Sequence, residues 1–167
     1  MNILGVNAYH GDSSACIVKD GKIIAAVEEE RFKRIKHWAG FPIESINFCL
    51  DEAKLSLSEV NHVAINSNPK SNFLKKVKYT LFNRPDIKLV LDRMKNKKSR
   101  TRVERELESA FKGTPFYGKV HFVEHHLSHM ASTHLVSPFE DSVAVSVDGF
   151  GDFSSAAWGV CRGQNIN

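Results

Sequence analysis

The sequence predicts an α/β fold in which an antiparallel meander belongs to a mixed sheet flanked by helices. Three observations lead to this prediction: short apolar runs separated by turn residues near the N-terminus, helical spacing of apolar residues further along, and a strand–loop–strand pattern that occurs twice. The chain has 167 residues, of which 42% are hydrophobic and 25% charged. This composition is that of a globular protein and excludes a disordered or fibrous one.

The N-terminal elements are predicted to be strands. Residues 2–7 form an apolar run, and after a polar loop residues 15–19 form a second one. Asp20-Gly21 is a strong signal for a two-residue hairpin turn, and residues 22–27 then form the third strand. Together these segments make a meander.

Helices and further strands follow the meander. Pro42 occupies a position typical of the start of a helix, and the apolar spacing after it continues to about residue 54. The other expected elements are a turn at 56–59, a strand at 62–66, two basic helices within 70–113, a strand at 120–123, a helix at 128–136, strands at 142–147 and 156–161, and a turn at 162–163.

One internal comparison indicates a duplication. When the chain is shifted by 141 residues, Asn7 falls on Asp148, and the SSA of residues 13–15 falls on the SSA of residues 154–156. A strand, a polar loop and a second strand therefore occur near both ends, and we expect each loop to face a shared cleft.

The duplication suggests how the domains are arranged. Residues 1–141 are expected to form a first lobe with a basic helical insertion at 70–113, and residues 142–167 to begin a second lobe. The second copy stops after two strands, too few to bury a sheet face, so we expect the sequence to be a piece of a longer chain.

The positive charge is concentrated in one segment. The net charge is +4, but residues 70–102 alone hold 12 Lys/Arg and 2 Asp/Glu, so the remainder of the chain is acidic. Two amphipathic helices with a solvated basic face account for this segment, and a surface that attracts an anionic ligand or nucleic acid is the alternative.

The cysteines and the hydropathy indicate a cytoplasmic protein. Cys16, Cys49 and Cys161 are an odd, widely spaced set, which argues against a disulfide framework and excludes a CxxC site. No run of 18 apolar residues and no signal-peptide pattern is present in the sequence, so no membrane association is expected.

The segments EHHLSH and VDGFGD contain a candidate metal site. His125 and His129 are four residues apart and would share one face of a helix, while Asp148 ends an apolar strand, where an unpaired carboxylate is costly. Together they form a His-His-carboxylate set suited to iron or zinc. Gly149 and Gly151 would let the backbone approach a ligand closely. Surface or core histidines at the start of a helix, with no ligand, and an ordinary Asp-Gly turn are the alternatives, and no HExxH motif is present in the sequence.

The loop between the first two strands contains further candidates. His10 could serve as a general acid or base, and Ser13 and Ser14, next to Asp12, could donate hydrogen bonds to phosphate oxygens. The acidic cluster at 28–30 could hold an amine- or hydroxyl-bearing acceptor or could be a solvated turn. P-loop, Rossmann and nucleophile-elbow motifs do not occur in the sequence.

These motifs together resemble a known family. NAYHGDSSACIV, DGKIIAAVEEERFKRIKHWAGFP, VEHHLSHMAS and VSVDGFGD are similar to the N-terminal part of the O-carbamoyltransferases of the nodulation and antibiotic-tailoring type. The resemblance covers most of residues 2–56 and 120–162, and the basic middle of the chain contributes little to it.

The resemblance implies a fold and an activity. It implies an actin/sugar-kinase/Hsp70-type architecture, in which two duplicated RNase H-like lobes enclose a nucleotide cleft. A second domain of such enzymes makes carbamoyl-adenylate from carbamoyl phosphate and ATP, and the actin-like domain transfers the carbamoyl group to a hydroxyl of a sugar or an antibiotic. The family is also similar to the tRNA threonylcarbamoyl-transfer enzymes.

The resemblance also assigns roles to residues. His125, His129 and Asp148 match the metal ligands, with iron expected and zinc possible, and His10 matches a loop histidine near the carbamoyl group. Contacts to substrate or nucleotide are expected from Asp12, Ser13, Ser14, Gly149 and Gly151. A further ligand aspartate, the arginines that bind carbamoyl phosphate and the adenylate-forming domain are not in this sequence, so these residues alone are expected to be inactive.

Other functions remain open at this point. A tRNA threonylcarbamoyl-type enzyme or a sugar kinase of the same superfamily would share the fold. A non-catalytic, truncated interaction module would also share it, but substituting its histidines would change neither metal content nor partner binding. A homodimer is compatible with each of these functions.

Overall fold

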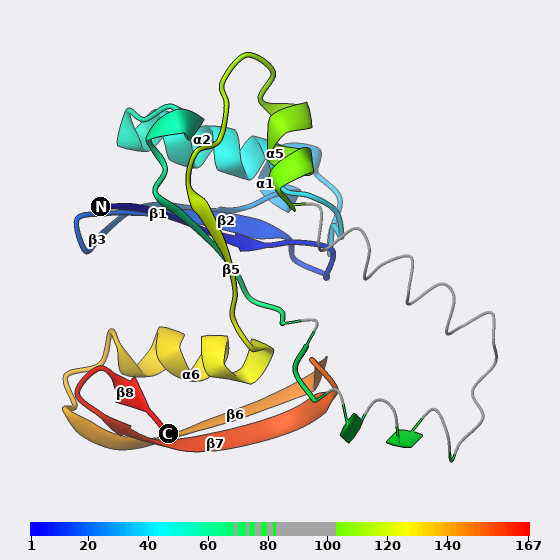
Figure 1. Ribbon diagram of the computed structural model, residues 1–167, viewed down its shortest axis with the longest axis vertical. Coiled ribbons are helices and arrows are strands. Elements are labelled where there is room, and N and C mark those ends of the chain that lie inside the picture. The colour runs from blue at the N-terminus through cyan, green and yellow to red at the C-terminus, as the bar shows by residue number, and fades with distance from the viewer. Residues whose placement is uncertain (69, 73, 76–77, 80–81, 83–102) are drawn as a thin grey trace. The chain divides into compact units, whose positions relative to one another are not determined.

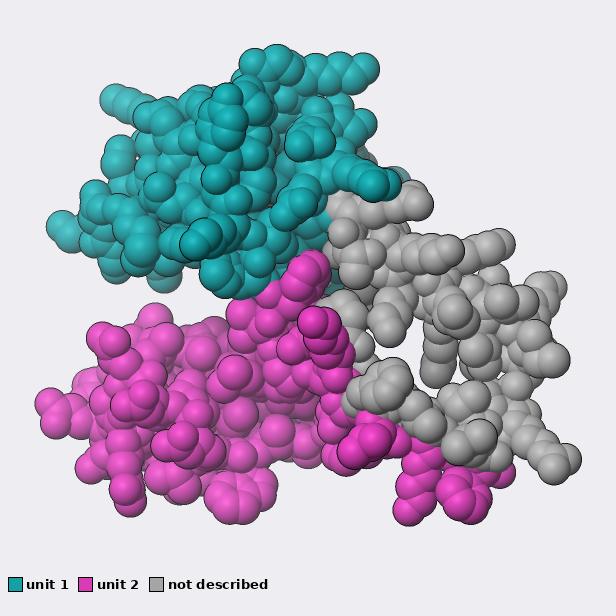
Figure 2. Space-filling view, viewed as in Figure 1, with its two compact units in different colours: residues 1–65, 87–121 teal, residues 66–86, 122–167 magenta. Residues whose placement is uncertain are grey.

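The computed structural model describes residues 1–68, 70–72, 74–75, 78–79, 82 and 103–167. The chain divides into two compact units, residues 1–65 with 87–121 and residues 66–86 with 122–167 (Figure 2). The expected boundary after residue 141 falls inside the second unit. Most of the two basic helices expected within 70–113 lie outside the described residues.

The first unit contains a mixed sheet. In its described residues the sheet order is β3-β2-β1-β4-β5, with β1 antiparallel to β2 and parallel to β4 (Figure 1). The elements are β1 (Asn2–Asn7), β2 (Ser14–Lys19), β3 (Lys22–Glu28), α1 (Glu30–Lys33), α2 (Ile43–Ala53), the 3₁₀ turn η1 (Leu57–Glu59), β4 (His62–Ile65), α5 (Val103–Ala110) and β5 (Lys119–Phe122). The meander expected from the sequence is confirmed.

The meander closes at the predicted hairpin. Asp20 and Gly21 have φ values of 50° and 80°, so both central residues of the turn are left-handed. A two-residue turn of this kind matches the twist of the adjoining strands, and Asp-Gly is a favoured pair for it.

The core of the first unit lies between the sheet and α2 (Figure 1). Alternate residues of β1, such as Leu4 and Val6, are buried, and Ile46 and Cys49 of α2 are completely buried. The alternation along the strand and the helical spacing on α2 place one face of each element against the other. This packing positions the loop between β1 and β2 at one end of the sheet.

A buried carboxylate accepts hydrogen bonds from the first turn of α2. Glu29 is fully buried, and it accepts hydrogen bonds from the backbone N–H and hydroxyl of Ser45, both at 2.8 Å, and from the backbone N–H of Glu44 at 3.3 Å. These donors belong to the first turn of the helix, whose N–H groups have no partner within the helix. Glu29, from the acidic cluster at 28–30, therefore caps a helix.

The second unit is a helix packed on an antiparallel sheet. Its described residues form α6 (His125–His134), β6 (Asp141–Gly151), β7 (Ser154–Arg162) and β8 (Asn165–Ile166), with sheet order β6-β7-β8. α6 lies along one face of this sheet (Figure 1), where Met130, Ala144 and Cys161 form the core. The other face carries exposed Val145 and Trp158. The helices in the described part of the chain are too short or too polar to span a bilayer.

The helix expected at 128–136 begins earlier than predicted. α6 starts at His125, because the carboxylate of Glu124 accepts a hydrogen bond from the backbone N–H of Leu127 at 2.7 Å and so caps the helix. The earlier start places His125 and His129 on the same helix.

The two hairpins have the same register. Val6 pairs with Ala15 in the first unit, and Val147 pairs with Ala156 in the second, so the pairs are related by a shift of 141 residues. The paired residues from Asn2↔Lys19 to Gly5↔Cys16 in β1 and β2 correspond by the same shift to the pairs from Val143↔Val160 to Ser146↔Ala157 in β6 and β7. This agreement supports the proposed duplication of a strand–loop–strand unit.

Candidate metal centre

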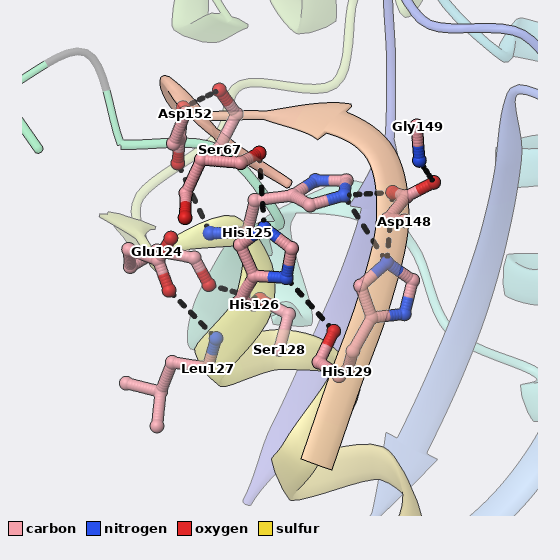
Figure 3. Close-up of polar contacts among 12 residues, drawn as sticks. Ser67, Glu124, His125, His126, Leu127, Ser128, His129, Asp148, Gly149 and Asp152 are labelled. Carbon is pink, nitrogen blue, oxygen red and sulfur yellow. Dashed lines mark hydrogen bonds and ion pairs between the residues drawn. The ribbon is translucent and has the colours of Figure 1, made fainter. Parts of the chain in front are cut away.

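Two histidines of α6 face the end of β6. His125 is the first residue of the helix and is buried, and His129 follows one turn later with its side chain half exposed. Asp148 lies near the end of β6, and its carboxylate points at both imidazoles (Figure 3). The spacing of four residues places the two rings on one side of the helix.

The distances fit a shared metal ion. His125 Nε2 lies 2.6 Å from Asp148 Oδ2 and 3.1 Å from His129 Nε2, and His129 Nε2 lies 3.5 Å from the same Asp148 oxygen. With metal–ligand bonds of about 2.1 Å, the ligand atoms of one ion are about 3.0 to 3.4 Å apart. The three atoms therefore need only small shifts to bind one ion, and two imidazoles with a carboxylate suit iron or zinc.

The carboxylate of the site is stabilised as an anion. The pKa of Asp148 is lowered from 3.8 to about 2, first by its hydrogen bond with His125 and next by the backbone N–H of Gly149, which donates to Oδ1 at 2.6 Å. These hydrogen bonds favour the charged carboxylate, which would be a charged ligand for a cation.

Two further histidines of α6 have structural roles. His126 is fully buried; its Nε2 donates to the carbonyl of Ser154 at 3.1 Å, and its Nδ1 lies 2.8 Å from the hydroxyl of Ser146 (Figure 3). His134 donates through Nε2 to the carbonyl of Gly163 at 2.7 Å. Hydrogen bonds from both rings therefore hold α6 against the hairpin of β6 and β7.

The two glycines of the loop have different surroundings. A side chain at Gly149 would meet no atom within 4 Å, so this position leaves the backbone open to a ligand. Gly151 is buried, and a Cβ there would overlap the imidazole of His125. Gly151 therefore contacts a candidate metal ligand of this chain, and its expected contact to substrate or nucleotide stays a prediction.

The sequence analysis did not assign a role to Asp152. Its carboxylate accepts a hydrogen bond from the backbone N–H of His125 at 3.0 Å, across 27 residues of sequence (Figure 3). The only sequence signal was its place in the loop that also contains Asp148. No spacing rule predicts that one aspartate of this loop contacts the ring of His125 and the other its main chain.

The remaining candidates lie in the first unit, in the loop between β1 and β2. The hydroxyl of Ser13 is buried and lies 2.9 Å from the carbonyl of Gly40, so it faces the protein interior. Asp12 is exposed and lies 2.9 Å from Nδ1 of His37. His10 is partly buried and Ser14 begins β2. The structure therefore places three of these residues in one loop and Ser14 at the start of the following strand, apart in sequence from the histidines of α6.

Comparison with known sequences identifies relatives of the whole chain. A family model described as carbamoyltransferase N-terminus matches residues 2–166. The uncharacterized protein sll1178 of Synechocystis sp. is 36% identical over 172 residues, covering 99% of this chain and 28% of that protein. Nodulation protein NolNO of Sinorhizobium fredii is 34% identical over 162 residues, covering 96% of this chain and 22% of that protein. The chain thus spans about a quarter of the length of these relatives.

Solved structures show the same fold. YeaZ from Pseudomonas aeruginosa matches with a TM-score of 0.50 at 13% identity, over 99% of this chain and 63% of that one. A ROK hexokinase from Thermus thermophilus matches with a TM-score of 0.50 at 12% identity, over 99% of this chain and 47% of that one. The expected actin/sugar-kinase/Hsp70-type fold is confirmed, and such low identity carries no information about activity.

Proposed function

The chain belongs to the carbamoyltransferase N-terminus family, and we propose that it is part of an enzyme that transfers a carbamoyl group from carbamoyl-adenylate to a hydroxyl of a sugar or another natural product. Carbamoyl-adenylate would be made from carbamoyl phosphate and ATP by a domain that this sequence does not contain. The observation that carries the proposal is the convergence of His125, His129 and Asp148 on one point.

The three residues would hold a metal ion, which we propose to be iron. Bound there, such an ion would act as a Lewis acid that polarises carbonyl and phosphate oxygens. The chain contributes two neutral imidazole nitrogens and one carboxylate, so the ligand set carries one negative charge toward the cation. The hydrogen bonds that lower the pKa of Asp148 favour this charged form.

His10 is proposed as the base for the acceptor. During transfer, the bond between the carbonyl carbon and the phosphate oxygen of AMP breaks as a bond to the acceptor oxygen forms. The hydroxyl proton of the acceptor must leave, and an imidazole can take it near neutral pH. Contacts of Asp12, Ser14 and Gly149 to the nucleotide or substrate are part of the same proposal.

The test measures metal content and carbamoyl transfer in the full protein. It is purified without chelators, and its metals are identified by mass spectrometry. Radiolabelled carbamoyl phosphate, ATP and a panel of sugars are then supplied, and labelled product and AMP are measured. We expect His129→Ala to lose both the metal and transfer, whereas His121→Ala, at an exposed histidine of β5, should retain both. Unchanged metal and transfer in His129→Ala would contradict the proposal.

The proposed base is tested separately. His10→Asn should lower transfer by about 10² to 10⁴, the usual contribution of a general base, while leaving the metal content unchanged. Transfer at the wild-type rate in this variant would remove His10 from the mechanism without affecting the metal site.

A further inference from the structure

The segment 148–152, which includes the end of β6, contacts His125 in three places. Asp148 lies 2.6 Å from Nε2 of the imidazole, and Asp152 accepts a hydrogen bond from the backbone N–H at 3.0 Å. Gly151 packs against the ring, so that an added Cβ would overlap Cδ2, Cγ and Nε2. A single short loop therefore contacts both the main chain and the side chain of one metal ligand.

The carboxylate of Asp152 is occupied by donors from the protein. Oδ1 accepts a hydrogen bond from the hydroxyl of Ser67 at 2.9 Å, and Oδ2 accepts from the backbone N–H of Asn68 at 2.6 Å and from that of His125 at 3.0 Å. Asp152 is not among the residues whose ligand atoms converge on the metal site. Its negative charge also lies at the N-terminus of α6, where the helix dipole favours an anion.

Gly151 and Asp152 are held in place by the turn that follows. Gly151 pairs with Ser154, and Asp152 and Phe153 between them have φ values of 46° and 70°. An aromatic residue rarely adopts a positive φ, so contacts around the turn must maintain this geometry. The ring of Phe153 lies 5.5 Å from that of Phe150, centroid to centroid.

We propose that Asp152 is a positioning residue of the metal centre and that Gly151 provides the space for the ligand imidazole. Asp152 fixes the main chain of His125, while the absence of a side chain at Gly151 leaves room for its ring. The inference rests on the metal site of the proposed function. Residues that orient ligands in this way usually change metal affinity by about tenfold to a hundredfold when they are replaced.

Two substitutions of Asp152 separate positioning from ligation. Asp152→Ala removes all three hydrogen bonds. Asp152→Asn can keep them, because its carbonyl oxygen accepts from the two N–H groups and its amide donates to the oxygen of Ser67. The full protein is stripped of metal and titrated with Co²⁺, followed by its visible absorption. We expect Asp152→Ala to bind about tenfold to a hundredfold more weakly, with an altered spectrum, and Asp152→Asn to resemble the wild type.

Two further variants make the test specific. Gly151→Ala adds a methyl group that would overlap the imidazole of His125, so it should weaken Co²⁺ binding and change the spectrum. Ser67→Ala removes one hydrogen bond to Asp152 but leaves the one to His125, so it should lower the thermal stability without weakening Co²⁺ binding.

The outcomes distinguish this inference from the proposed function. Wild-type affinity in Asp152→Ala, equal losses in Asp152→Asn and Asp152→Ala, or an equal loss in Ser67→Ala would overturn the positioning role. Failure of the wild-type protein to bind Co²⁺ would overturn the metal site itself. The titration needs no carbamoyl donor or acceptor, so an absence of transfer activity does not affect it.

Discussion

Replacing Glu29 by alanine should loosen the start of α2 strongly. The Glu29 carboxylate is fully buried, and Ser45, whose backbone N–H and hydroxyl both donate to it, is fully buried as well. In Glu29→Ala these two donors lose their acceptor at a fully buried position. The substitution therefore combines the loss of a helix cap with the burial of unsatisfied polar groups.

The magnitude follows from these two losses. An N-cap contributes about 1 kcal/mol, and leaving a buried donor unsatisfied costs about 1 to 3 kcal/mol. We therefore expect α2 to lose about 2 to 4 kcal/mol of local stability. Since each 1.4 kcal/mol is a factor of ten, the amides of α2 should exchange about thirtyfold to a thousandfold faster.

Hydrogen–deuterium exchange of the peptide that contains α2 measures this effect directly, because it reports local opening of one element. Glu44→Ala is the matched control: its side chain is 47% exposed, contacts Lys33 at 3.6 Å, and should cost less than about 1 kcal/mol. Equal exchange rates for Glu29→Ala and Glu44→Ala would refute the capping role and return Glu29 to the residues available for a ligand.

Three other predictions follow from the described contacts. Gly5→Ala would place a Cβ 2.6 Å from Sγ of Cys16, so it should lower the free energy of unfolding by about 1 to 3 kcal/mol, measured by thermal unfolding. Adding Cys16→Ala removes the overlapping sulfur and should restore most of this stability; a double variant as unstable as Gly5→Ala would contradict direct overlap. Burial raises the pKa of Tyr9 from 10.0 to about 12, so the neutral phenol stabilises the fold below pH 10.0 and this stabilisation is lost as the pH rises toward 12. Tyr9→Phe should therefore remove a phenolate absorbance step near pH 12, not near pH 10.0. The pKa of Asp148 is lowered from 3.8 to about 2, so the charged carboxylate stabilises the fold above pH 3.8 and this stabilisation is lost as the pH falls toward 2. The effect should be small, because the side chain is 40% exposed and solvent screens its charge. A carboxyl NMR titration of the metal-free protein should show this midpoint, and His125→Ala should raise it; a midpoint at 3.8 in the wild type would refute the hydrogen bond as its cause.

Strands and turns that depend only on neighbouring residues could be predicted from local sequence patterns. Alternating apolar residues and the Asp20-Gly21 turn were enough for the meander, since strand period and turn conformation depend on neighbouring residues. The shift of 141 residues predicted the shared register of the two hairpins, because a copied sequence pattern preserves which side chains face the core. The spacing of His125 and His129 was likewise sufficient to suggest a pair of ligands.

The start of α6 was predicted three residues too late. Glutamate is not among the residues that commonly cap helices, so Glu124 gave no sequence signal, and its hydrogen bond to Leu127 became evident only from the structure. The buried position of Ser13 was likewise not evident from the sequence, because its hydroxyl lies beside the carbonyl of Gly40, 27 residues away.

The surroundings of the proposed metal ligands depended entirely on the tertiary structure. The carboxylate of Asp152 joins Ser67 and His125, which are separated from it by 85 and 27 residues, and Gly151 matters because the ring of His125 packs against it. Hydrogen-bond and packing partners this distant along the chain leave no periodic trace in a single sequence. The residue types capable of metal chemistry can be recognised from the chain alone, whereas the groups that orient them are determined by how the hairpin of β6 and β7 folds against α6.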